Sequence, residues 1–401
     1  MAVIGLASAV AGFVKIRHLV DKAVIDNAIF RMHYRVTSAI LFLSCVIVTA
    51  NNLIGDPINC IGDGAIDRHV INTYCWITYT FTMPSHRDKP IGSHVAYPGV
   101  GPVIPGEEPI YHSYYQWVPF VLFFQGILFY GPHYIWKNYE DGKMRMLTEG
   151  MRGPLFHNIN SEERISRQKK VASYITDSLH TNNYYSSWYF LCEFLNFVNV
   201  IGNIFFVNRF LGGAFLDYGT DVLRFSELDQ ENRTDPMIAV FPRVTKCTFH
   251  KYGPSGSIQR HDTLCILALN ILNEKIYIFL WFWFIILAVF TAIAIVLSAA
   301  VILMPNIREA VIRRKYRPLN NANNVPTLVR KTQLGDFLIV YLLGQNVSET
   351  VYSEVMEEVC QNLENNSNGP PPSAMLSAPP TAPPGLEMSN LYPTVEKRTD
   401  V

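Results

Sequence analysis

Four long apolar segments constrain the fold of this chain more than any other feature. They occupy residues 36–54, 117–136, 185–207 and 276–304. A helix crosses the hydrocarbon core of a bilayer with about 20 apolar residues, so the pattern predicts four transmembrane helices. The fourth segment is longer than a bilayer requires, and we expect it to tilt or to continue past the membrane. The third is the weakest, because it contains Glu193 and several asparagines.

The composition agrees with a membrane protein and argues against several other classes. Only 16% of the residues are charged and 49% are hydrophobic, whereas soluble chains carry about 25% charged residues. The formal net charge is zero, so no basic field suggests a nucleic-acid partner. The sequence has no P-loop pattern and no recognisable set of catalytic His, Asp and Ser residues. We therefore expect a protein that is not an enzyme and that uses no cofactor or metal.

The distribution of lysine and arginine predicts which loops face the cytoplasm. Basic residues are frequent before the first segment, after the second and after the fourth, whereas residues 55–113 contain only three. Because basic loops stay on the cytoplasmic side, both termini and the middle loop are expected there. The predicted organisation is an N-terminal segment (1–35), four spans (36–54, 114–136, 185–211 and 276–304), two outer loops (55–113 and 212–275), a cytoplasmic loop (137–184), a cytoplasmic C-terminal region (305–360) and a disordered tail (361–401).

An aromatic cluster opens the second span. Tyr and Trp favour the membrane interface, so Tyr114, Tyr115 and Trp117 are predicted to anchor this span. Positions 114 and 117 of a helix share a face, and we expect that pair of rings to pack on a neighbouring span while the ring at 115 faces the lipid headgroups. Gln116 is expected to bond to backbone at the loop boundary. Pro119 lies in the first turn, where its missing N–H costs little.

Two cysteines lie in each predicted outer loop. Cys60 and Cys75 belong to the first loop, and Cys247 and Cys265 to the second. In an oxidising compartment such an even set predicts disulfides, and four cysteines allow three connectivities, among which the residues alone do not choose.

A zinc site is the alternative for the second outer loop. Cys247 and His250 are followed by His261 and Cys265 at a spacing that zinc could use. Thiolates persist poorly outside the cell, and two partner cysteines lie in the other loop. We therefore favour disulfides, with the histidines as bystanders.

Four motifs lie in the outer loops and at the starts of the spans that follow them. They are NTYCW at 72–76, YYQWVPF at 114–120, DPMIAVFPRVTKCTF at 235–249 and NEKIYIFLWFWF at 273–284. Together they resemble the innexins, the gap-junction proteins of invertebrates. The likeness covers about residues 1–345.

The resemblance implies a fold and a function. The fold would be an all-α membrane protein, a four-helix transmembrane bundle with a short N-terminal pore helix, two disulfide-linked extracellular loops and a helical cytoplasmic region. The function would be that of a gap-junction channel subunit in the plasma membrane. Its hemichannels, homomeric or mixed with other innexins and octameric in characterised relatives, would dock between cells and pass ions and small solutes. Alternatives are an unpaired hemichannel that releases small molecules and a tetraspan adhesion or scaffold protein.

The resemblance also implies roles for particular residues. The disulfides would join Cys60 to Cys265 and Cys75 to Cys247. The apolar N-terminal segment would fold into the pore mouth, although an amphipathic helix on the inner membrane face is the alternative. The pore-lining candidates in this segment are Met1, Ala2, Val3 and Gly5.

Polar residues within or beside the spans permit two interpretations. Asn51, Asn52 and Asp56 follow the first span, where they could line the outer vestibule or serve as ordinary interfacial caps. Glu193 shares one helix face with several asparagines of the third span. An ionisable group in a span suggests function, but we favour hydrogen bonding between packed helices. The asparagines concerned are Asn196, Asn199 and Asn203.

Two short motifs suggest modification and binding. Asn232 begins an N-R-T glycosylation sequon in the second outer loop, where a glycan would oppose cell-to-cell pairing, and we favour an unused sequon. The Pro-rich tail is predicted to be disordered. It ends in Thr399, Asp400 and Val401, a pattern that PDZ domains bind.

Overall fold

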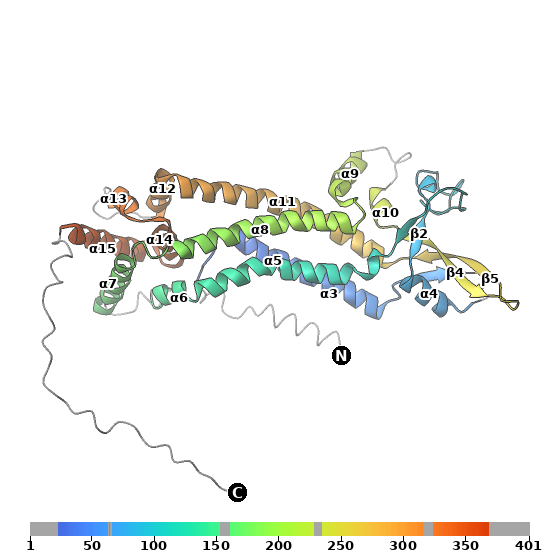
Figure 1. The fold of residues 1–401 in the computed structure, drawn as a ribbon, viewed down its shortest axis with the longest axis horizontal. Coiled ribbons are helices and arrows are strands. Elements are labelled where there is room, and N and C mark those ends of the chain that lie inside the picture. Colours follow the sequence, from blue (N-terminus) through green and yellow to red (C-terminus); the bar gives the residue numbers. More distant parts are fainter. Residues whose placement is uncertain are drawn as a thin grey trace, which may run out of the picture.

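In the computed structural model, four long helices run side by side between a β-sheet at one end and a group of shorter helices at the other (Figure 1). We call the end with the sheet the outer end, and the sheet with the segments around it the outer domain. The structure describes residues 23–62, 64, 66–152, 161–227, 235–315 and 324–368.

The four long helices have the length and composition to cross a membrane, as the apolar segments predicted. Most are longer than those segments, and the last has 35 residues. At about 1.5 Å per residue it measures about 50 Å, more than a hydrocarbon core of about 30 Å. It therefore continues past the membrane. The helices are the first span, made of α2 (Ala28–Arg31), η1 (Met32–Thr37) and α3 (Ser38–Ile54), then α5 (Val118–Glu140), α8 (Asn183–Phe210) and α11 (Leu269–Leu303).

Apolar side chains from all four helices form the interior of the bundle. Leu41, Leu122, Val200 and Leu280 are buried in one cluster. The first span contains a π-helical turn, η1, in which the Thr37 hydroxyl donates to the Met32 carbonyl at 3.0 Å. Such turns widen a helix locally and shift the faces that follow.

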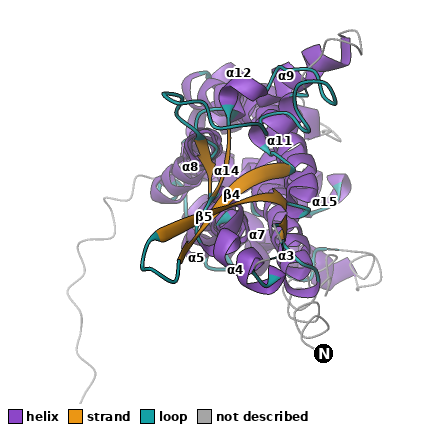
Figure 2. Cartoon of the chain, turned by 90° about the vertical axis from the view of Figure 1, so that its right-hand side faces the viewer, coloured by secondary structure: helices purple, strands orange, loops and turns teal. Residues whose placement is uncertain are grey.

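The outer loops fold into a five-stranded antiparallel sheet, so the all-α expectation is wrong for this part of the chain (Figure 2). The strand order is β1-β5-β4-β2-β3, which places the hairpin of the second loop between strands of the first. Short connecting elements flank the sheet and the start of α5. Elements of the first loop are β1 (Asn59–Ile61), α4 (Arg68–Ile77), β2 (Thr80–Thr82), η2 (Pro84–His86), β3 (Ile110–His112) and η3 (Tyr114–Gln116); those of the second are α9 (Phe215–Glu227), α10 (Pro236–Val240), β4 (Val244–Tyr252) and β5 (Ile258–Ile266).

The β4–β5 hairpin is the longest part of the sheet. Its register runs from Val244 opposite Ile266 to Tyr252 opposite Ile258. β-Branched and aromatic residues, which suit a pleated surface, are frequent in both strands. Gly256, with a φ of 82°, lies in the turn that joins them, because glycine adopts this left-handed conformation at little cost.

Shorter helices cover the opposite end of the bundle. In α15, Val351, Val355, Val359 and Leu363 recur every four residues and are buried in a core shared with α7, α12, α13 and α14. The helix continues through residues 361–368, which the sequence analysis assigned to the disordered tail. The short helices are α6 (Lys143–Thr148), α7 (Ser161–Asp177), α12 (Pro305–Lys315), α13 (Asn324–Lys331), α14 (Leu334–Asn346) and α15 (Glu349–Asn368).

Candidate functional site

The four sequence motifs meet where the outer domain joins the membrane helices. We call this region, residues 72–76, 114–120, 235–249 and 273–284, the outer junction. Its side chains come from α4, from the turn before α5, from the segment that leads into β4, and from the first turns of α11.

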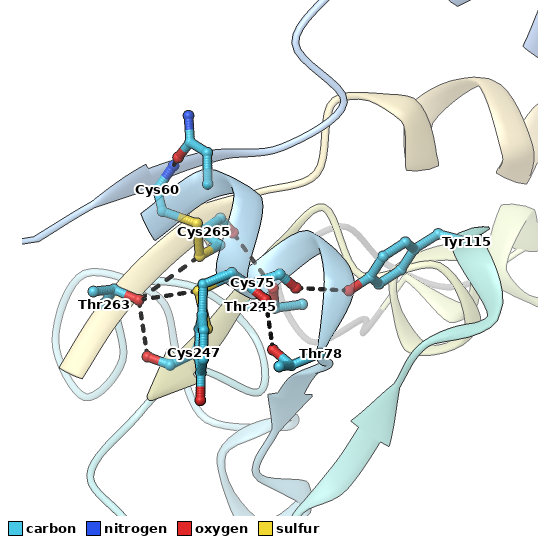
Figure 3. The surroundings of a disulfide bond; sticks show 10 residues. Cys60, Cys75, Thr78, Tyr115, Thr245, Cys247, Thr263 and Cys265 are labelled. Atoms are coloured by element: carbon cyan, nitrogen blue, oxygen red, sulfur yellow. Dashed lines mark hydrogen bonds between the residues drawn. A yellow bond between two sulfur atoms is a disulfide. The ribbon is translucent and has the colours of Figure 1, made fainter. Parts of the chain in front are cut away.

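Two disulfides join the outer loops. Cys60 of β1 is bonded to Cys265 of β5, and Cys75 of α4 is bonded to Cys247 of β4 (Figure 3). These are the pairs that the family resemblance implied. Cys60 and Cys265 also lie opposite each other in the sheet register. A sulfur in a disulfide cannot act as a thiolate ligand, so the structure does not form the alternative zinc site.

Hydrogen bonds fix the backbone around both disulfides. The Thr263 hydroxyl donates to the Cys247 carbonyl at 2.8 Å, and the Cys60 amide donates to the Asn72 side chain at 2.8 Å. The ring of Tyr74 meets that of Phe249 edge-on, with centroids 4.7 Å apart. The NTYCW motif therefore holds α4 against the sheet.

The aromatic cluster before α5 packs against the outer domain. The Tyr115 hydroxyl donates to the Cys75 carbonyl at 3.1 Å (Figure 3). The Tyr115 ring lies 4.7 Å from that of Trp76. Burial raises the pKa of Tyr115 to about 12, so the hydroxyl remains protonated and able to donate. Gln116 donates to the carbonyls of Trp76 and Ile77, at the loop boundary where such bonds were expected. Pro119 lies in the first turn of α5.

The predicted packing of the aromatic cluster is right for Tyr114 and wrong for the other two rings. The Tyr114 ring packs edge-on against Phe210 at the end of α8, and also against Phe241, which precedes β4. Tyr115, expected to face headgroups, is 1% exposed, whereas Trp117, expected to pack on a neighbouring span, is 60% exposed. The reason is that these rings contact a folded outer domain, which the sequence analysis treated as loops.

A buried ion pair connects the second outer loop to α11. The Glu274 carboxylate is completely buried, and it accepts hydrogen bonds from Arg243 Nη2 at 2.7 Å and Nε at 3.1 Å. These hydrogen bonds raise the pKa of Arg243, which therefore keeps its charge. The Asn270 amide donates to the Pro242 carbonyl at 2.7 Å. The sequence analysis missed this pair, because it started the last span at residue 276 and left Glu274 at the end of an outer loop.

The family model for innexins matches residues 26–363 of the chain. The chain belongs to the innexin family. It is 58% identical to Innexin inx3 of Drosophila melanogaster over 99% of its own length and 98% of that protein. It is 48% identical to Innexin inx2 of Schistocerca americana over 88% and 98% of the two chains, and 47% identical to Innexin inx2 of Drosophila melanogaster over 90% and 97%.

Innexins are subunits of gap-junction channels, and their hemichannels are oligomers that dock across cells at the plasma membrane. This innexin is therefore a channel protein, not an enzyme. The outer junction connects the membrane helices of this innexin to its disulfide-bonded outer domain.

The pore candidates of this innexin are only partly described. Asn51 and Asp56, at the outer end of the first span, are exposed, whereas Asn52 is partly buried beside Trp76 and Gln116. The remaining candidates for pore lining, glycosylation and PDZ binding lie outside the described residues. These are Met1, Ala2, Val3, Gly5, Asn232, Thr399, Asp400 and Val401.

Glu193 forms hydrogen bonds between helices. Its carboxylate accepts from the Asn27 amide at 2.7 Å and from the Ser298 hydroxyl at 2.6 Å, and thereby connects the first span, α8 and α11. On the same face, the Asn203 amide donates to the Asn199 carbonyl at 2.8 Å, a bond within α8. The contacts of Glu193 support hydrogen bonding between packed helices as the role of this residue.

Three contacts hold the chain just before the first span, and we call residues 24–27 the N-terminal anchor. The Asn346 side chain of α14 pairs with both backbone groups of Val24, at 2.6 and 2.7 Å. Trp136 Nε1 of α5 donates to the Ile25 carbonyl at 2.9 Å. With the bond from Asn27 to Glu193, the anchor is attached both to the shorter helices at this end of the chain and to the membrane bundle.

We expect substitutions in the aromatic cluster to destabilise the protein according to how deeply each ring is buried. Tyr115→Ala removes a buried ring and should reduce the free energy of unfolding by about 3–5 kcal/mol. Trp117→Ala is the control with an exposed ring and should cost less than about 1 kcal/mol. The measurement is the temperature at which detergent-purified oligomer is lost, read by size-exclusion chromatography. Equal losses for the two variants would show that burial within one chain does not decide the effect.

Proposed function

We propose that this innexin is inserted with the sheet outside the cell and with both termini and the loop between α5 and α8 in the cytoplasm. Disulfides form in an oxidising compartment, and both of those in the structure lie at the outer end. Basic residues gather beyond the opposite ends of the spans, as in α12, which ends in Arg313, Arg314 and Lys315.

In this orientation the chain forms one subunit of an octameric hemichannel, homomeric or mixed with other innexins. The N-terminal segment, including Met1, Ala2, Val3 and Gly5, forms a short pore helix, and Asn51, Asn52 and Asp56 line the outer vestibule. The exposure of Asn51 and Asp56 at the outer end of the first span supports the second assignment. Hydrated polar side chains favour the passage of ions.

The tip of the β4–β5 hairpin is the proposed docking surface, and its exposed apolar side chains are the observation that carries the proposed junctional function. Tyr252 and Ile258, the last pair of the register, are 76% and 64% exposed, and the hairpin reaches farthest from the membrane helices (Figure 1). Exposed apolar side chains at such a position suit a protein–protein contact. The disulfides at the base of the hairpin hold it in a fixed direction.

A double substitution tests this proposal. Tyr252→Asp with Ile258→Asp should reduce the conductance between paired cells at least tenfold, because charges would be buried at the docked contact without partners. The current of single cells through unpaired hemichannels should stay unchanged. The measurement is dual voltage clamp of paired cells, beside surface biotinylation.

Val70→Asp is the matched control. Val70 is 49% exposed on α4, which lies nearer the membrane helices than the hairpin tip (Figure 1). This variant should retain junctional conductance. Normal coupling in the double variant would exclude the tip as the docking surface. Loss of the single-cell current would instead indicate failure of the whole channel.

Two further assignments depend on sequence motifs alone. Asn232 is proposed to remain unglycosylated, so that no glycan obstructs docking. The carboxyl end, Thr399, Asp400 and Val401, is proposed to bind a PDZ scaffold, supported by the extended Pro-rich linker that precedes it.

A further inference from the structure

A cavity of about 710 Å³ lies at the outer ends of α5 and α8, beside α9 and α10. Side chains of both charges line it, namely Arg87, Arg209, Asp217 and Asp221. Within the described part of the chain, none of the four forms an ion pair. Arg209, Asp217 and Asp221 are exposed and Arg87 is partly buried, so these groups are accessible from outside the chain. Two cationic and two anionic groups around one cavity suit a ligand that carries both a positive and a negative group.

The cavity lies at the level of the membrane interface. Trp117, just before the first turn of α5, and Phe210, the last residue of α8, both line it. One turn further into the membrane on each helix, Phe120 and Phe206 are 58% and 47% exposed. In the proposed orientation the charged groups therefore lie at headgroup height, and these aromatic rings lie one helical turn deeper, at the depth of acyl chains; Phe120 also lines a second pocket beside the first span.

We propose that this cavity binds the headgroup of a zwitterionic phospholipid. The phosphate lies between Arg87 and Arg209, because guanidinium groups form paired hydrogen bonds with phosphate oxygens. The ammonium group lies near Asp217 and Asp221. The acyl chains follow Phe120 and Phe206 into the bilayer. The assignment of this lipid to the outer leaflet rests on the orientation proposed above; the binding site itself does not.

The charges argue against other occupants. An anionic lipid would bring no cation to the two carboxylates, which would then repel it. A wholly apolar ligand would cover part of these charged groups without offering any of them a polar partner. The exposed ring of Trp117, and that of Tyr111 on β3, offer faces on which a quaternary ammonium group binds by cation–π attraction. Phosphatidylcholine therefore fits the cavity best.

Lipid retention by the full-length oligomer tests the proposal. The protein is purified in detergent, supplied with isotope-labelled phosphatidylcholine and analysed by native mass spectrometry. We expect one retained lipid per subunit and at least a tenfold weaker retention in Arg209→Gln. Arg224→Gln is the matched control, because Arg224 lies on α9 but does not line the cavity. It should retain the lipid as the unmodified protein does.

A second variant keeps the test independent of charge. Ala239 of α10 lines the cavity, and Ala239→Phe should fill it and displace the lipid while every charge remains. Parallel samples contain phosphatidylglycerol or inorganic phosphate. Retention of phosphatidylglycerol equal to that of phosphatidylcholine would overturn the zwitterionic assignment, and displacement by phosphate alone would identify a site for a soluble anion.

Two other outcomes would refute the site itself. One is equal retention of phosphatidylcholine in the unmodified protein, Arg209→Gln and Ala239→Phe. The other is that the unmodified protein retains no lipid while Arg209→Gln and Ala239→Phe both lose the oligomer. That result would mean that a neighbouring subunit fills the cavity. None of these outcomes depends on junctional conductance, so failure here is distinct from failure of the docking proposal.

Discussion

Arg243→Ala is expected to destabilise the folded chain by about 3–5 kcal/mol, because it leaves the completely buried carboxylate of Glu274 without its main partner. The ion pair joins the segment before β4 to the first turns of α11, so the outer domain should lose its attachment to the membrane helices. We expect little channel at the cell surface and no junctional conductance. Surface biotinylation and oligomer thermostability provide the measurements.

Two controls separate the buried pair from charge in general. Lys275 also contacts the Glu274 carboxylate, at 3.1 Å, but its side chain is 57% exposed. Lys275→Ala should therefore cost less than about 1 kcal/mol. The double variant Arg243→Met with Glu274→Leu removes both charges and should recover most of the lost stability. An Arg243→Ala variant as stable as Lys275→Ala would contradict this interpretation.

Loss of the disulfide between α4 and β4 should have an effect of similar size. Replacing Cys75 and Cys247 together with serine is expected to cost about 2–5 kcal/mol and to abolish docking, because the two outer loops would lose a covalent connection across 172 residues of sequence. Surface biotinylation and paired-cell conductance are the readouts. Peptide mapping without reductant identifies the pairs directly.

Cys45→Ser is the matched control for this variant. Cys45 is a free cysteine of the first span, and its thiol donates to the Pro119 carbonyl, a bond that serine can also form. The Cys45→Ser variant should keep normal junctional conductance. If the double serine variant docks and conducts normally, or if mapping finds disulfides only within each loop, the proposed role of these bonds is wrong.

The membrane helices could be predicted because lipid imposes a simple rule of length and hydrophobicity. The sheet escaped prediction for two reasons. Strands β1, β2 and β3 have three residues each, too short for a recognisable alternation. The strands β5 and β4, with which β1 and β2 pair, lie more than 100 residues away in the sequence. The β4 run from Val244 to Tyr252 did carry a signal, since β-branched and aromatic residues precede a Gly-rich turn.

In the outer junction, too, some residues could be predicted from the sequence and others could not. The family motifs contain Cys75, Cys247, Tyr115 and Gln116, and the structure places all of them in the junction. Hydropathy alone starts the last span near residue 276, whereas α11 begins at Leu269. The turns between contain Asn270 and Glu274, which resemble loop residues until the outer domain is seen to bury them. Burial of Tyr115 and exposure of Trp117 likewise depend on that domain.

The N-terminal anchor has a mechanical consequence for the channel. Val24 is paired through both of its backbone groups with Asn346, and Ile25 is bonded to Trp136 only one residue later. There is no slack between these attachments. A protein that binds the shorter helices and displaces α14 would therefore pull on the start of the first span or break the Asn346 bonds. In the proposed orientation, force applied at the cytoplasmic helices would reach the first span through this anchor, without any change in the outer domain.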